Sequence, residues 1–109
     1  MSLNVEEMAA AMLAAFQGSL SEKWPEVKEY AEAEAKKLAE NFVLIEKLYL
    51  TNKINERQAE LHRDIQKNAT RAVLLAIEGL GLLAVEEAIN SALDVLIDTV
   101  NTALGFDLL

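Results

Sequence analysis

Hydrophobic and polar positions alternate along this chain with the period of an α-helix rather than that of a strand. Apolar residues recur every three or four positions, and the strong helix formers Ala, Leu, Glu and Lys dominate the sequence. Only four Gly and one Pro interrupt the pattern. We therefore predict an all-α fold without strands, in which residues 1–109 form a single domain.

The first helix is predicted from Asn4 to about Gln17. Asn4 can cap the free N–H groups of the first turn, and two glutamates follow it, where they suit the positive end of the helix dipole. Met8 and Met12 recur at helical spacing, which indicates one apolar face that fills a core. Gly18 is expected to end the helix, because glycine readily adopts positive φ.

The second helix is predicted to include Pro25 and to end at about Leu50. Its start has two alternatives, a cap at Ser19 or a cap at Ser21, and the sequence does not choose between them. The alternating Ala and Glu residues at 31–35 predict a solvated helix face. The buried side is predicted to comprise Val27, Tyr30, Ala31, Leu38, Phe42, Ile45, Leu48 and Tyr49.

A sharp turn is predicted at residues 51–55, because each residue there suits a mechanical role. Asn52 can adopt the left-handed conformation that closes a helix. Asn55 can cap the next helix, with Gln58 three residues later to complete a reciprocal capping box, and Ile54 can pack across the start of that helix. A connection this short predicts an antiparallel helical hairpin.

The chain beyond Glu56 is predicted to form a very long or kinked C-terminal helix. Of the 35 residues from Ala72 to Phe106, 22 are apolar and none is Lys, Arg or Pro. A loop should carry polar residues and a cap, yet Gly79-Leu80-Gly81 is embedded between Leu75-Ala76-Ile77-Glu78 and Leu82-Leu83-Ala84-Val85. This context favours a continuous or bent helix over a loop. The alternative is a self-contained four-helix bundle that is broken at these three residues.

The apolar arc of the C-terminal segment is wider than one neighbouring helix can cover. We expect the first helix to continue in line with the second and to cover part of this arc. The remaining apolar face predicts a homodimer that forms a helical bundle from two hairpins. The predicted interface residues are Leu83, Ala84, Ala88, Ile89, Ala92, Leu93, Leu96 and Val100.

The protein is acidic, with a formal charge of −8, and this charge is unevenly distributed. All ten basic residues lie between Lys23 and Arg71, and the chain beyond Arg71 carries only acids. The absence of a basic face argues against nucleic acid as a partner. The acids at 78, 86 and 87 argue against insertion of the apolar segment into a membrane. No signal peptide is apparent, and we expect a cytoplasmic protein.

The sequence offers no constellation for catalysis, for a cofactor or for a metal. It contains no cysteine, and His62 has no second ligand one helical turn away, where Gln58, Ala59, Ile65 and Gln66 stand. No nucleophile–base pair or phosphate-binding loop is present. We therefore expect that the protein is not an enzyme and needs no cofactor.

Two functions remain after these exclusions. The first is a non-enzymatic helical assembly or protein-interaction module, whose partner is a second copy of itself or another helical protein. Accessory proteins of phage and other mobile elements are often small helical chains of this kind. No particular residue of this sequence supports that analogy. The alternative is a binder of an apolar ligand or membrane surface through the helical core.

Overall fold

The computed structural model describes all of residues 1–109 and is entirely helical, which confirms the predicted all-α class. The helices are α1 (Val5–Ser19), α2 (Trp24–Leu50), α3 (Glu56–Leu75), α4 (Leu82–Asp94) and α5 (Ile97–Leu104). A short 3-10 helix, η1 (Ser21–Lys23), joins α1 to α2.

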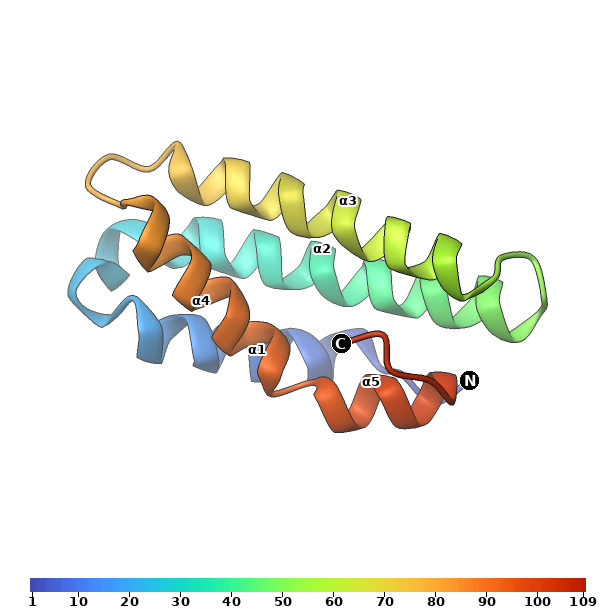
Figure 1. Cartoon of the computed structure of the whole chain (residues 1–109). Helices are drawn as coiled ribbons and strands as arrows, with labels where there is room; N and C mark the ends of the chain where they lie inside the picture. Colours follow the sequence, from blue (N-terminus) through green and yellow to red (C-terminus); the bar gives the residue numbers. More distant parts are fainter.

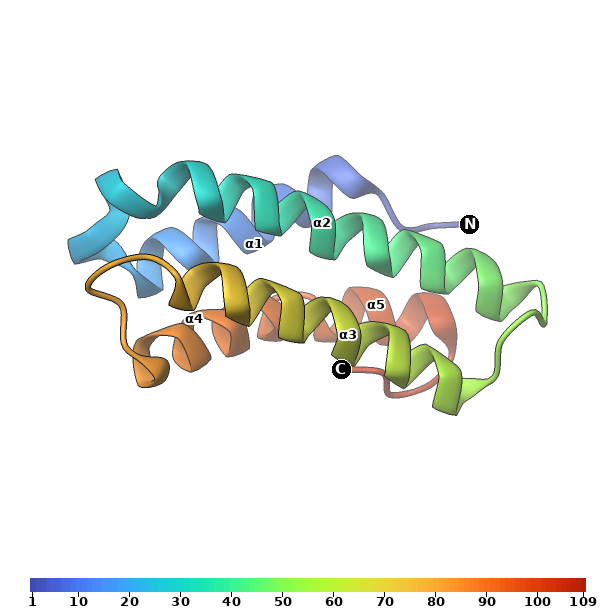
Figure 2. The ribbon, with the colours of Figure 1, turned by 90° about the horizontal axis from the view of Figure 1, so that it is seen from above.

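The helices form an elongated bundle of 42 × 22 × 18 Å (Figure 1). The helix α1 packs against α2 and α4, and α2 packs against α3. The fourth side, between α3 and α4, has the sparsest contact. In the view from above, α4 and α5 follow one another along the length of the bundle, and α4 packs against α3 (Figure 2). The first three helices and the α4–α5 pair therefore form the four sides of one bundle.

One hydrophobic core runs through the centre of this bundle. All five α-helices contribute to it, and α3 contributes least for its length, with only Ala59 and Leu74 among its apolar residues. The largest side chains that are completely enclosed are Phe16, Phe42, Met12, Leu38, Ile45, Leu74, Ile89 and Leu108. A core of this size is built by a single chain, with Met8 and Met12 acting as close-packed filling rather than as a binding surface.

The start of α1 confirms the predicted cap, because the Glu7 backbone N–H donates to Asn4 Oδ1 over 2.9 Å. The prediction that Gly18 ends the helix is wrong, since α1 continues to Ser19. The expectation that the first two helices lie in line is also wrong. The chain turns through η1, and α1 packs along the side of α2. Neither Ser19 nor Ser21 caps α2, whose N-cap residue is Lys23.

The chain reverses between α2 and α3 by the local interactions predicted for residues 51–55. Asn52 has φ 61°, in the left-handed region. Asn55 Oδ1 accepts from the Gln58 backbone N–H over 2.8 Å, and Gln58 Oε1 accepts from the Asn55 N–H over 2.9 Å. This reciprocal pair is the predicted capping box. Ile54 is partly buried and packs against the core.

The prediction of a continuous or bent helix through Gly79-Leu80-Gly81 is wrong. The helix α3 ends at Leu75, and α4 begins at Leu82. Gly79 has φ 90°, which a right-handed helix cannot accommodate, and Gly81 is in an extended conformation as the N-cap residue of α4. The glycines therefore form a loop that lets α4 fold back onto α1. This is the broken bundle kept above as the alternative.

A second break, which the sequence analysis did not predict, separates α4 from α5 at Val95 and Leu96. No Gly or Pro marks this position. The break changes the direction of the chain, so that α4 packs against α1 whereas α5 packs against α2. The very long C-terminal helix of the prediction is thus three separate helices, α3, α4 and α5.

The last residues, 105–109, fold back as a tail between α3 and α5 (Figures 1 and 2). Gly105, with φ 82°, closes α5 in the left-handed conformation. Asn101 Oδ1 then accepts from the backbone N–H groups of Leu108 and Leu109 over 2.9 and 3.0 Å, and Arg63 Nη1 donates to the Leu108 carbonyl. Leu108 is thereby enclosed, and the tail covers the core where α3 and α5 do not meet.

Candidate interaction surface

The surface with the clearest capacity for binding is the face of α3 that points away from the core. The apolar residues Leu61, Ile65 and Leu75 have exposed fractions of 44%, 69% and 38%, and Ala72 is exposed beside them. Large apolar side chains exposed in a row at helical spacing mark interaction sites. We call this row the α3 seam, and its members are Gln58, Leu61, Ile65, Asn68, Ala72 and Leu75.

The spacing of the α3 seam is that of a coiled coil. Its members follow one another at intervals of three and four residues, which is the repeat that keeps one face of a helix against a partner helix. The opposite face of α3 is the one that enters the bundle, through Ala59, Thr70 and Leu74. The helix α3 therefore has two apolar faces, of which this chain covers one.

A shallow depression of about 150 Å³ adjoins the first half of the seam. It is lined by Ile54, Gln58, Leu61, His62 and Ile65. His62, which the sequence analysis considered and set aside as a metal ligand, thus lies in a mainly apolar surface depression. A side chain from a partner could enter here and bury both Leu61 and Ile65.

Charged residues flank the seam on the side that faces α4. Arg57, Asp64 and Arg71 follow at seven-residue intervals, so all three lie along the same edge of α3. Asp64 is 47% exposed and pairs with Arg63 over 2.8 Å, and Arg71 pairs with Glu86 of α4. The hydrogen bond from Arg71 and its positive charge hold the pKa of Glu86 below its ordinary value, although partial desolvation opposes this shift.

Two glutamates of α2 are buried, which the sequence analysis did not predict. Glu34, in the segment expected to be a solvated face, is only 2% exposed, so that expectation is wrong for this residue. Glu34 Oε1 accepts from the Thr70 hydroxyl over 3.0 Å, and Lys37 Nζ donates to Glu34 Oε2 over 3.1 Å. Its position three residues after Ala31 and four before Leu38 is a signal that could have placed it on the inner face.

The second buried carboxylate, Glu46, holds the start of the chain. It accepts from the backbone N–H groups of Ser2 and Leu3 over 3.0 and 3.2 Å, and from the Ser2 hydroxyl over 3.2 Å. These donors satisfy a carboxylate that is 1% exposed. Because their hydrogen bonds are satisfied within the chain, Glu34 and Glu46 are structural groups that fix α3 and the N-terminal segment on α2.

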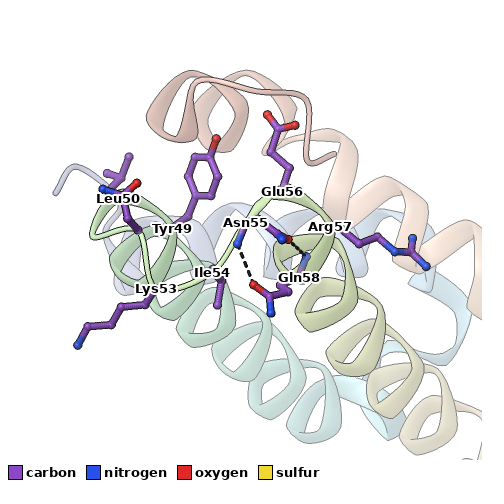
Figure 3. A pocket seen from close by; sticks show the side chains of 9 residues that line it. Tyr49, Leu50, Lys53, Ile54, Asn55, Glu56, Arg57 and Gln58 are labelled. Carbon is purple, nitrogen blue, oxygen red and sulfur yellow. Dashed lines mark hydrogen bonds between the residues drawn. The ribbon is translucent and has the colours of Figure 1, made fainter.

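The largest concavity, about 810 Å³, lies at the turn between α2 and α3 and is broadly open to solvent (Figure 3). Asn55 and Gln58 are already occupied by their reciprocal hydrogen bonds, whereas Lys53 and Arg57 extend away from one another. The ring of Tyr49 packs against that of Phe106 of the tail in a tilted arrangement, with ring centroids 4.8 Å apart. The concavity is therefore the surface of a well-capped turn, without convergent polar groups that could bind a small ligand.

The predicted interface residues lie mostly inside the single chain. Six of them belong to its core, with exposed fractions of 7% or less, namely Ala88, Ile89, Ala92, Leu93, Leu96 and Val100. Ala84 is partly buried, and only Leu83 is prominently exposed, at 74%. A partner could reach the six buried residues only if α4 and α5 left the bundle. The pattern of α3 alone predicts Ala59, Leu61 or His62, Ile65 and Ala69 on its inner side, and this prediction is right for Ala59 but wrong for Leu61 and Ile65, which are exposed.

Tyr30 is a further difference between expectation and structure. It was predicted on the buried side of the second helix but is 51% exposed, so that prediction is wrong for this residue.

Leu44 of the same helix is 45% exposed. The hydrogen bond between Glu34 and Thr70 sets the register of α2 against α3, and in this register residue 44 lies level with about residue 60. Leu44 is thus at the height of the first half of the α3 seam.

Comparisons with family models, curated proteins and solved structures gave no match for this chain. No group of three or more His, Cys, Asp or Glu side chains is arranged to hold a metal ion. None of the helices combines the length and the apolar character that are needed to cross a membrane. The residues of the surface itself are therefore the basis for a functional proposal.

Proposed function

We propose that this protein is a non-enzymatic helical assembly module, which acts by associating with a second copy of itself through the α3 seam. The observation that carries the proposal is the exposure of Leu61, Ile65 and Leu75 along one face of a helix whose other face is already packed. Water contact with this row is unfavourable, and a partner helix would remove it. The proposed partner surface is α3 rather than the predicted C-terminal segment, because six of the eight residues predicted for that interface are buried inside the chain.

The distribution of charge supports α3 as the meeting surface. The chain as a whole carries −8, so two copies repel one another when acidic surfaces approach. The helix α3 carries four basic and three acidic residues, whereas α4 and α5 together carry four acids and no base. Two copies therefore meet with the least repulsion through α3.

The alternative function, binding of an apolar ligand, has weaker support. The methionines that suggested an adaptable cavity, Met8 and Met12, are 2% and 0% exposed within a closed core. The seam also offers the spacing of a helix-binding surface rather than a concave site that encloses a small molecule. We therefore propose a protein partner.

Sedimentation equilibrium tests the proposal with two matched substitutions. Ile65→Asp places a charge in the α3 seam, and because Ile65 is 69% exposed, the fold of the single chain should be unchanged. We expect at least about a hundredfold weaker dimerisation, since each dimer loses two buried isoleucines. Leu83→Asp alters an equally exposed leucine on α4 and should leave the dimer intact.

The reverse outcome, in which Leu83→Asp dissociates the dimer and Ile65→Asp does not, would place the interface on α4. A dimer that survives both substitutions would indicate that α4 and α5 exchange between copies, which would bring the six buried residues into the interface. A protein that stays monomeric at all concentrations would refute self-association. Circular dichroism of each variant confirms that helix content is retained.

A further inference from the structure

We propose that two copies pair through the α3 seam in an antiparallel arrangement, with Leu61 of one copy opposite Ala72 of the other. This inference rests on the proposed function and specifies the partner surface and its register. It follows from the residue types of the seam, from the charges beside it and from the coiled-coil spacing.

The large and the small members of the seam are placed along it in an order that fits this register. With Leu61 opposite Ala72, the antiparallel geometry also places Ile65 opposite Asn68. It further places Leu75 opposite Gln58. Each large apolar side chain thus meets a smaller or a flexible one, so that facing residues can interdigitate without a clash.

The charges beside the seam select the same register. The seam has two positions in each seven-residue repeat. In an antiparallel coiled coil, the residue that directly precedes the first of these positions faces the equivalent residue of the partner helix, and here Asp64 and Arg71 are such residues. Asp64 of each copy would meet Arg71 of the other, which gives two attractive pairs by symmetry. A shift of one heptad in one direction would place Asp64 against itself, and a shift in the other direction would place Arg71 against itself.

The groups involved are accessible and close to the seam. Asp64 is 47% exposed, and Arg71, at 26%, lies between α3 and α4, where it already binds Glu86 and Asn68. An additional carboxylate from a partner would join a guanidinium that can donate five hydrogen bonds. The dimer would therefore extend an existing ion pair and would not break it.

Engineered cysteines test the register directly, because the chain contains no native cysteine. Protein carrying Leu61→Cys is mixed with protein carrying Ala72→Cys under mild oxidation. In the proposed register positions 61 and 72 face one another, whereas two copies of either position lie about 16 Å apart along the helix at 1.5 Å per residue. A disulfide requires Cα atoms within roughly 7 Å. We expect cross-linked dimers in the mixture and none in either protein alone.

A charge reversal provides the second readout. Asp64→Arg would place an arginine of each copy opposite Arg71 of the other, at two sites related by the symmetry of the dimer. We expect about tenfold weaker dimerisation. Glu32→Arg changes the net charge of the chain equally, but it lies on α2 outside the seam, and should leave dimerisation unchanged. Equal effects of the two substitutions would overturn the proposed ion pair.

The outcomes separate this inference from the proposed function. Cross-links in Leu61→Cys or Ala72→Cys protein alone would indicate parallel pairing and overturn the register while self-association stands. A dimer in sedimentation equilibrium that gives no cross-link in the mixture would do the same. Absence of a dimer from the unmodified protein would overturn both proposals.

Discussion

The helix α3 and the segment formed by α4 and α5 differ in the burial of their apolar residues. The difference is the reverse of what their compositions indicate. The α4–α5 segment is the more apolar, yet its large residues Ile89, Leu93, Leu96 and Val100 are buried within the chain. The helix α3 is rich in charge, yet it exposes Leu61 and Ile65. The number of neighbours does not explain this difference, because α3 and α4 each pack against two helices and leave an outer face to solvent. Exposure depends on which face carries the apolar residues: α4 turns Ile89 and Leu93 toward the core, whereas α3 turns Leu61 and Ile65 away from it.

The comparison also explains how a mostly polar helix is attached to the bundle. The helix α3 contributes few apolar residues to the core and is held in addition by specific polar contacts: Thr70 to Glu34, Arg71 to Glu86 and the Arg63 side chain to the tail. A buried polar contact is sensitive to loss of one partner, because the other is then left unsatisfied. We therefore expect α4–α5 to respond most to lost burial and α3 to lost hydrogen bonds.

The largest effect is expected from a charge in the α4–α5 core. Leu96→Asp places a carboxylate at a position that is 2% exposed and should lower the free energy of unfolding by at least about 3 kcal/mol. Asp98→Leu alters an exposed neighbour and should change it by less than about 0.5 kcal/mol. Thermal melts followed by circular dichroism compare the two. Similar melting temperatures for both variants would contradict the burial of this face.

A smaller effect is expected from the polar attachment of α3. Thr70→Val keeps the size of the side chain but removes the hydroxyl that donates to buried Glu34, and should cost about 1–3 kcal/mol. Thr99→Val, on the exposed surface of α5, is the matched control and should be nearly neutral. Urea unfolding measures both differences. A neutral Thr70→Val would show that Glu34 is satisfied without α3.

The loop that connects α3 to α4 is expected to be sensitive to substitution of Gly79 but not to substitution of Gly81. Gly79→Ala introduces a side chain at φ 90°, and its Cβ would lie 2.8 Å from Lys23 Nζ. The strain should cost roughly 1 kcal/mol or somewhat more. Gly81→Ala meets nothing within 4 Å at an ordinary φ and should have only a slight effect. Chemical unfolding of the two variants separates them, and equal losses would mean that the strain at Gly79 is unimportant.

The smallest effect is expected from the ion pair that joins α3 to α4. Because the folded pKa of Glu86 is lowered, its contribution to stability is complete above the unfolded pKa, near 4.5, and is lost as the pH falls through the folded value. The melting temperatures of the unmodified protein and Glu86→Gln should therefore differ slightly at neutral pH and converge in acid. In an Arg71→Gln background this pH-dependent difference should disappear. A difference that persists unchanged at low pH would assign the effect to another cause.

Much of the local structure is determined by short stretches of sequence. The cap at Asn4, the end of α2 at Leu50 and the capping box of Asn55 and Gln58 follow from side chains that bond to backbone groups within a few residues. Helical periodicity likewise placed Leu38, Phe42 and Leu96 on buried faces. These features are predictable because their causes lie within one or two helical turns.

The tertiary structure decided how the helices meet, and therefore which apolar face remains exposed. Gly79-Leu80-Gly81 is compatible with either a bent helix or a loop. The chain forms a loop there, which lets α4 pack on α1. Glu34 is buried because Thr70, 36 residues away in the sequence, supplies its hydrogen bond. Ile89 and Ile65 are equally apolar as residues, but only Ile89 finds neighbours in the folded chain. Burial depends on contacts between distant segments, and no local pattern contains that information.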